Sequence, residues 1–145
     1  MYDRILLATD GSDTAKLAAE RATEMADRRD ATLHVFYVAE RTRDDPVEKG
    51  FEEKLTEEIS AGREIVGAID SRASERGLDT EVTVEVGVPH VRIERYVDEH
   101  DVGLTVVGST GASEITEKLL GTVAKYVVNE APSDVFVVRP DAALA

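Results

Sequence analysis

Short apolar runs alternate along the chain with longer segments whose apolar residues recur every three or four positions. An apolar run that ends at turn-forming residues is typical of a buried strand. Five such runs predict strands over residues 4–9, 31–38, 80–86, 102–108 and 134–138. Helical spacing predicts a helix after residue 12, one over about 47–76, a short one that begins near residue 89, and one over about 122–130.

This alternation predicts an α/β fold: a single-domain, open sheet of five parallel strands with helices on both faces. A chain of 145 residues suits one domain, so residues 1–145 are taken as a single unit. Residues 39–50 are polar and contain Pro46 and Gly50, which indicates a mobile connection. Residues 141–145 are expected to form a frayed tail.

Two loops of the predicted sheet are candidates for a binding site. Ala8, Thr9 and Asp10 follow the first strand, and residues 108–122 follow the fourth. In open parallel sheets, ligands bind beyond the carboxyl ends of the strands, at the point where the strand order switches. We therefore expect these two loops to lie side by side at a ligand site.

The longer loop is rich in small and hydroxyl residues, namely Gly108, Ser109, Thr110, Gly111, Gly121 and Thr122. A strand that breaks into such residues and resumes as a helix leaves backbone N–H groups unpaired, and the start of the helix favours an anion. The loop therefore predicts a phosphate cradle. The alternative is that its glycines only end a strand and begin a helix.

The charge balance excludes several classes of partner. The chain has 30 acidic and 17 basic residues and a net charge of −13, so its surface repels nucleic acid and anionic membranes. It has no apolar run of about 18 residues, the length of a membrane-spanning helix, and no signal-peptide pattern at Met1. These observations predict a cytoplasmic protein. Because it has no cysteine, disulfides and thiolate metal sites are excluded. The acid excess and the scarcity of lysine suggest a halophilic protein adapted to a salt-rich cytoplasm, and an ordinary acidic protein is the alternative.

The glycine loop also resembles a known signature. Its spacing G-x2-G-x9-G-[ST], present as GSTG-ASEITEKLL-GT, resembles the ATP-binding signature of the universal stress protein family. Three other passages resemble the same family in the same order: RILLATDGSDTAKLAAERA, VGVPHVRIERYVDEHDVGLTVVG and VAKYVVNEAPSDVFVVRP. The resemblance covers essentially the whole chain, and it implies a Rossmann-like fold of the adenine nucleotide alpha hydrolase-like type.

The resemblance implies a role for each site residue. Ala8, Thr9 and Asp10 would meet the ribose or adenine side, Val38 would lie against the base, and Val107 and Gly108 would lie by the ribose. The phosphates would be held through backbone and hydroxyl groups by Gly111, Gly121, Thr122 and Val123. Ala124 stands where members often carry Ser or Thr, which removes one hydroxyl from the phosphate end. The cations nearest in sequence are Lys118 and Lys125, so Mg²⁺ or Mn²⁺ is expected to accompany ATP.

Several of these residues also have simpler interpretations. Asp10 could cap the following helix through N–H groups near Asp13. His34, within a strand, is expected to be a packed core histidine, whereas His90 and His100 flank a helix and are expected to be solvated. No two histidines have the spacing of metal ligands, and sequence order alone assembles no Ser-His-Asp set, so no catalytic residue is assigned. Neither a Walker motif nor a protein-kinase motif is present, which argues against an enzyme.

The closing strand, Asp134 to Val138, is apolar and comes last, so it is expected at an edge of the sheet. In the resembled family this strand pairs with its twin, which implies a homodimer; the alternative is a monomer in which residues 139–145 shield the edge. The leading functional hypothesis is an ATP-binding stress-response regulator. The alternatives are a slow ATP hydrolase or phosphotransferase, and a partner-binding structural dimer that holds AMP or no nucleotide.

Overall fold

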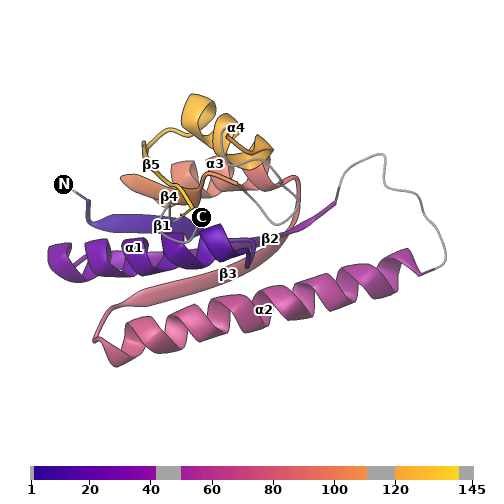
Figure 1. Cartoon of the computed structure of the whole chain (residues 1–145), viewed down its shortest axis with the longest axis horizontal. Helices are drawn as coiled ribbons and strands as arrows, with labels where there is room; N and C mark the ends of the chain where they lie inside the picture. Colours follow the sequence, from indigo (N-terminus) through magenta and orange to yellow (C-terminus); the bar gives the residue numbers. More distant parts are fainter. Residues whose placement is uncertain (1, 42–49, 111–119, 141–145) are drawn as a thin grey trace.

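The computed structural model describes residues 2–41, 50–110 and 120–140 (Figure 1). The elements in these ranges are β1 (Arg4–Ala8), α1 (Asp13–Arg29), β2 (Thr32–Glu40), α2 (Phe51–Glu75), β3 (Thr80–Gly87), α3 (Pro89–Glu99), β4 (Leu104–Gly108), α4 (Thr122–Glu130) and β5 (Asp134–Val138). Strands and helices alternate throughout, as the apolar pattern predicts. No helix of the described ranges is long and apolar enough to cross a membrane.

The five strands form one parallel sheet in the order β3-β2-β1-β4-β5. β1 lies between β2 and β4, with Ile5 paired to Leu33 on one side and to Leu104 on the other. The chain progresses outward from β1 in one direction through β2 and β3, and in the other through β4 and β5. The strand order therefore switches between β1 and β4, where the two candidate loops begin. The predicted Rossmann-like α/β fold is confirmed.

Helices cover both faces of the sheet (Figure 1). Ile5 and Leu7 of β1 belong to the apolar cluster beneath α1 and α2, whereas Leu6 belongs to the cluster beneath α3 and α4. This alternation follows from the period of two in a strand, which sends successive side chains to opposite faces. The centre of β1, Ile5 to Leu7, is fully buried because both faces are covered, which explains its apolar run.

Some boundaries differ from the sequence prediction. β2 continues to Glu40 because Ala39 and Glu40 still pair with Val86 and Gly87 of β3, so the predicted connection over 39–50 began too early. α2 begins at Phe51, and the start predicted at residue 47 falls outside the described residues. Residues 42–49 and the predicted tail at 141–145 also lie outside them.

The predicted end of α2 is confirmed. Arg76 is the C-cap and is followed by Gly77 with φ of +82°, a left-handed conformation that glycine adopts without strain. The turn returns the chain directly to β3. This places the carboxyl end of β3 at the same edge of the sheet as those of β1, β2 and β4.

Candidate functional site

A cavity of about 520 Å³ lies at the carboxyl edge of the sheet, around the ends of β1, β2 and β4. Its volume falls in the range of about 300–1,000 Å³ that is usual for small-molecule sites. The ends of these strands, the first turn of α3 and the first turn of α4 supply most of the wall. The cavity therefore occupies the place that strand topology favours for a ligand.

The cavity brings most of the predicted site residues together. Those on its wall are Ala8, Thr9, Asp10, Val38, Val107, Gly108, Ser109, Gly121, Thr122, Val123 and Ala124. Thr110 is not part of the wall; its hydroxyl lies 3.3 Å from that of Thr14 at the start of α1. Gly111 lies outside the described residues, so its predicted place at the phosphates remains a prediction.

Asp10 shapes the turn that opens α1. Its carboxylate accepts a hydrogen bond of 2.9 Å from the N–H of Ser12, and Ser12 in turn caps α1 by accepting one of 3.2 Å from the N–H of Ala15. The N-cap of α1 is therefore Ser12 and not Asp10, whose carboxylate bonds the N–H of the capping residue instead of N–H groups near Asp13. The side chain of Asp10 remains exposed on the cavity wall, where it can also meet a ligand.

Gly108 has a packing role as well as a place on the wall. A Cβ at this position would lie 3.0 Å from Cγ2 of Thr14 and 3.4 Å from the backbone nitrogen of Ala15. The end of β4 can therefore approach the first turn of α1 only because residue 108 has no side chain. This close approach brings the β1 and β4 loops together.

The first turn of α4 forms part of the cavity wall. Gly121 is the N-cap, with extended φ and ψ of −64° and 167°, and being a glycine it has no side chain with which to cap the helix. Its N–H donates to the carbonyl of Ser109 over 2.6 Å, and the N–H of Ser109 donates to the carbonyl of Val138 over 2.7 Å. These bonds fix the first turn of α4 beside the ends of β4 and β5. The positive end of the helix dipole is thereby held at the wall.

Ser109 is the most unusual polar residue of the wall. Its side chain is 0% exposed, and among the described residues its hydroxyl has no hydrogen-bond partner. A buried hydroxyl without a partner costs about 1–3 kcal/mol. Because Ser109 also lines the cavity, a ligand placed there could supply the missing partner.

The opposite part of the wall is apolar and aromatic. Phe36 is buried and lies 4.7 Å, between ring centroids, from Tyr96, while Val38 and Ile93 belong to the same apolar cluster. Such a surface suits the face of a planar base.

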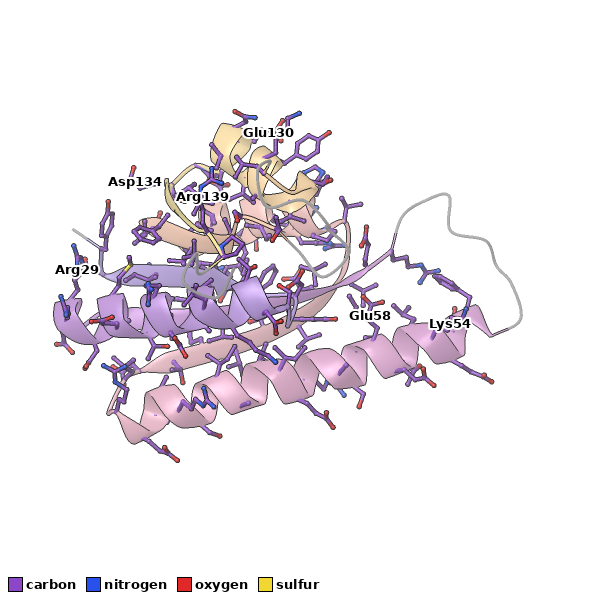
Figure 2. The ribbon with its side chains drawn as sticks, viewed as in Figure 1. Arg29, Lys54, Glu58, Glu130, Asp134 and Arg139 are labelled. Carbon is purple, nitrogen blue, oxygen red and sulfur yellow. The ribbon has the colours of Figure 1, made fainter. Side chains whose placement is uncertain are left out.

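Acidic side chains lie at the rim of this part of the cavity. Glu58 of α2 accepts a hydrogen bond of 3.1 Å from the N–H of Glu40 at the end of β2 (Figure 2). Burial raises the pKa of Tyr37, and the negative charges of Glu58 and Asp10 raise it further. No lysine or arginine is found among the described residues of the wall.

Sequence reasoning missed nine residues of the wall: Ala15, Phe36, Tyr37, Glu40, Glu58, Val88, Pro89, His90 and Ile93. The signal for several of them was present, because the ends of β2 and β3 lie at the same edge of the sheet as the ends of β1 and β4. Nothing in the local sequence indicates Glu58, which lies within a long amphipathic helix.

His90 was expected to be solvated, and this prediction is wrong. Its side chain is only 21% exposed, and its ring stacks on Tyr126 of α4 with centroids 4.1 Å apart. Nδ1 of His90 lies 3.7 Å from Oε1 of Glu94 on the next turn of α3. Burial raises the pKa of Glu94, the neighbouring carboxyl group of Glu130 raises it further, and His90 lowers it.

The other two histidines form a second cluster away from the cavity. His34 is 2% exposed, as predicted for a core histidine, and its Nδ1 lies 2.7 Å from the hydroxyl of Tyr96. Burial lowers the pKa of His34, the negative charge of Glu81 raises it, and the charges of His100 and Arg4 lower it. His100, expected to be solvated, instead stacks on Tyr96 with centroids 3.8 Å apart. That prediction holds only in part, because His100 is partly exposed while one face of its ring is covered by Tyr96.

Comparison with known proteins places this architecture in a family. Residues 1–139 match the universal stress protein family. Universal stress protein MJ0531 of Methanocaldococcus jannaschii is 32% identical over 144 residues, which cover 96% of this chain and 83% of that protein.

Solved structures show the same similarity. Universal stress protein UspA from Lactobacillus plantarum superposes with a TM-score of 0.84 at 26% identity, over 95% of this chain and 98% of that one. A universal stress protein solved in complex with cAMP superposes with a TM-score of 0.71 at 28% identity, over 95% and 97% of the two chains. The resemblance found in the sequence is confirmed, and the chain belongs to the universal stress protein family.

Proposed function

We propose that this protein binds an adenine nucleotide, ATP with Mg²⁺ or Mn²⁺, in the cavity at the carboxyl edge of the sheet. It would act as a cytoplasmic stress-response regulator whose surface or assembly depends on nucleotide occupancy. The observation that carries the proposal is the buried hydroxyl of Ser109, which has no hydrogen-bond partner among the described residues and lies on the cavity wall with the first turn of α4. Together they offer hydrogen-bond donors to a phosphate from one direction.

The remaining wall suits the other parts of a nucleotide. The apolar surface of Phe36, Val38 and Ile93 would receive the base, and the carboxylate of Asp10 would accept hydrogen bonds from ribose hydroxyls. A relative solved in complex with cAMP supports an adenine nucleotide as the class of ligand.

A divalent ion fits the charge of this wall. Asp10, Glu40 and Glu58 are acidic, and the described wall has no lysine or arginine to offset a triphosphate. Mg²⁺ and Mn²⁺ prefer oxygen ligands, and Mg²⁺ commonly keeps several waters while it binds phosphates and one or two protein groups. The hydroxyl of Thr122, at the phosphate end, is the protein group that would hold it. When bound, the ion would neutralise part of the triphosphate charge.

The test is equilibrium binding of ATP, ADP and AMP to the purified full chain, with and without Mg²⁺ or Mn²⁺. Gly121→Val should weaken ATP binding at least about tenfold, because a branched side chain would stand where the phosphates approach the backbone. Gly67→Ala is the control, since a Cβ at that position in α2 would meet nothing within 4 Å. Equal ATP affinity in the Gly121→Val variant and the parent would show that the phosphates are placed wrongly.

The same titration separates the alternatives. Incubation with ATP, followed by measurement of ADP, detects a slow hydrolase; unchanged ATP supports a binding protein. Absence of affinity for all three nucleotides would favour a structural dimer and contradict the proposal.

We also propose that β5 mediates a homodimer. β5 is the last strand of the sheet and pairs only with β4 among the described strands. Phe136 on this strand is 40% exposed, an unusual state for a phenylalanine of a single domain. Pairing with the β5 strand of a second copy would bury this side chain and provide hydrogen-bond partners for the backbone groups at the edge of the sheet.

A further inference from the structure

Three side chains that commonly bind metal ions meet where α3 packs against α4. One ligand atom each from His90, Glu94 and Glu130 lie within 4.8 Å of one another. His90 and Glu94 come from the first half of α3, and Glu130 is the last residue of α4 (Figure 2). The cluster contains a nitrogen and carboxylate oxygens, a combination that differs from the oxygen donors expected around a nucleotide-bound Mg²⁺.

The geometry of both helices produces this cluster. His90 and Glu94 are four residues apart on α3 and so share a face of that helix. Tyr126 and Glu130 are likewise four residues apart on α4. Because the rings of His90 and Tyr126 stack at 4.1 Å with an interplanar angle of 12°, the two faces are held against each other.

Two of the ligand atoms are buried without a partner. Nδ1 of His90 and Oε1 of Glu94 are closed to solvent and, in the part of the chain that the structure describes, make no hydrogen bond. Their separation of 3.7 Å is too long for a hydrogen bond. The ion pairs among described residues give neither Glu94 nor Glu130 a lysine or arginine. Among the described residues, these two unpaired atoms and the carboxylate of Glu130 therefore lie together without a lysine or arginine.

Helix stability does not explain Glu130. A carboxylate in the last turn of a helix lies at the negative end of the helix dipole, where it is unfavourable. Glu130 also makes an electrostatically poor neighbour for Glu94, whose pKa it raises. A cation between the two carboxyl groups would reverse both effects.

We propose that His90, Glu94 and Glu130 form a binding site for a divalent transition-metal ion of the Zn²⁺ type. One imidazole and two carboxylates give three protein ligands and balance the charge of the ion, and water completes a tetrahedron. Zn²⁺ at about 2.0–2.2 Å from each ligand keeps the ligand atoms of a tetrahedron about 3.3–3.6 Å apart. To bind the ion, the three ligand atoms thus need to move only slightly closer together, and a rotation of the exposed Glu130 side chain can bring this about. The ion would tie α3 to α4 and fix the His90 ring on the wall of the cavity.

Titration of Zn²⁺ into the nucleotide-free full chain tests the site. In 0.5 M KCl, which screens diffuse attraction by the acidic surface, we expect one Zn²⁺ per chain and no competition from excess Mg²⁺. A hundredfold excess of Zn²⁺ over its dissociation constant should raise the melting temperature by about 5–10 °C.

Matched variants identify the ligands. Glu130→Gln should fold normally, because the residue is exposed, and should weaken Zn²⁺ binding at least about tenfold, since losing even a residue that only supports a ligand costs about 10–100-fold. Glu99→Gln is the control: Glu99 is the exposed last residue of α3, and its replacement changes the net charge equally. Unsaturable Zn²⁺ binding, or equal weakening by both variants, would overturn the site. Because no nucleotide is present, the result is independent of the proposed nucleotide function.

Discussion

Replacement of Ser109 by alanine should make the protein more stable and a weaker nucleotide binder at the same time. The hydroxyl of Ser109 is fully buried and, among the described residues, has no hydrogen-bond partner. Leaving such a group unsatisfied costs about 1–3 kcal/mol. Ser109→Ala removes that cost and leaves a void of only one oxygen atom, so we expect a net gain of about 1 kcal/mol. In a domain of this size the melting temperature should rise by about 2–4 °C.

The same substitution removes a donor for a phosphate. A hydrogen bond to a charged group contributes about 1.5–3 kcal/mol, which corresponds to a loss of about 10–150-fold in ATP affinity. Thermal unfolding without ligand measures the first effect, and isothermal titration with Mg²⁺ and ATP measures the second. Opposite signs of the two changes would identify Ser109 as a residue kept for binding.

Ser133→Ala is the matched control. The hydroxyl of Ser133 lies 2.8 Å from that of Thr105 and donates a bond of 3.0 Å to the carbonyl of Asp134. Loss of the Ser133 hydroxyl removes this hydrogen-bond partner from the buried hydroxyl of Thr105. The variant should therefore be less stable by about 1–3 kcal/mol and should bind ATP as the parent does. The reasoning is refuted if Ser109→Ala lowers stability to a similar extent while its ATP affinity stays unchanged.

Four further predictions concern packing, pH, assembly and salt. Gly62→Ala should lower the melting temperature relative to Gly67→Ala, because a Cβ at residue 62 would clash with the Tyr37 ring whereas one at residue 67 meets nothing within 4 Å. Such overpacking costs about 1–3 kcal/mol of stability. Equal melting temperatures of the two variants would contradict this packing. The pKa of His34 is lower in the folded chain than its value of about 6.5 in the unfolded chain, because folding disfavours the protonated ring. The free energy of unfolding should therefore be highest above about pH 6.5 and should fall as the pH drops below that value. Chemical unfolding between pH 7.5 and pH 5 should therefore show a smaller loss in His34→Gln than in the parent, and identical slopes would exclude His34 as the cause. Phe136→Lys should reduce the mass measured by light scattering from about twice 15.8 kDa to 15.8 kDa, whereas a monomeric parent would contradict the β5 dimer. The melting temperature should rise strongly between low and about 1 M KCl, where charges are screened beyond about 3 Å; no gain would refute salt adaptation.

Local sequence was sufficient to predict the fold. The unbroken apolar run of β1 and the alanine face of α1 indicate a strand buried on both faces and a helix lying close to the sheet. The boundaries were less predictable because strand pairing sets them. Ala39 and Glu40 are followed by polar residues, yet they stay in β2 because Val86 and Gly87 extend beside them.

The candidate site was predictable where it follows strand topology. Asp10 and Gly121 could be placed because loops after adjacent strands must meet at the switch point. The position of His90 could not, because it depends on stacking with Tyr126, thirty-six positions later in the sequence, and so on the packing of α3 against α4. The unpartnered state of Ser109 is likewise a property of burial in three dimensions.

The most direct test of the central proposal is the change in backbone amide NMR signals when Mg²⁺ and ATP are added to the isotope-labelled full chain. If the nucleotide binds as proposed, the largest shifts will be those of Asp10, Val38, Ser109 and Thr122, which come from four separate segments and meet only at the cavity. Signals at the far end of α2, such as that of Ala73, should not move. Saturating ATP that leaves the cavity residues unshifted, or that shifts a different surface, would contradict the account.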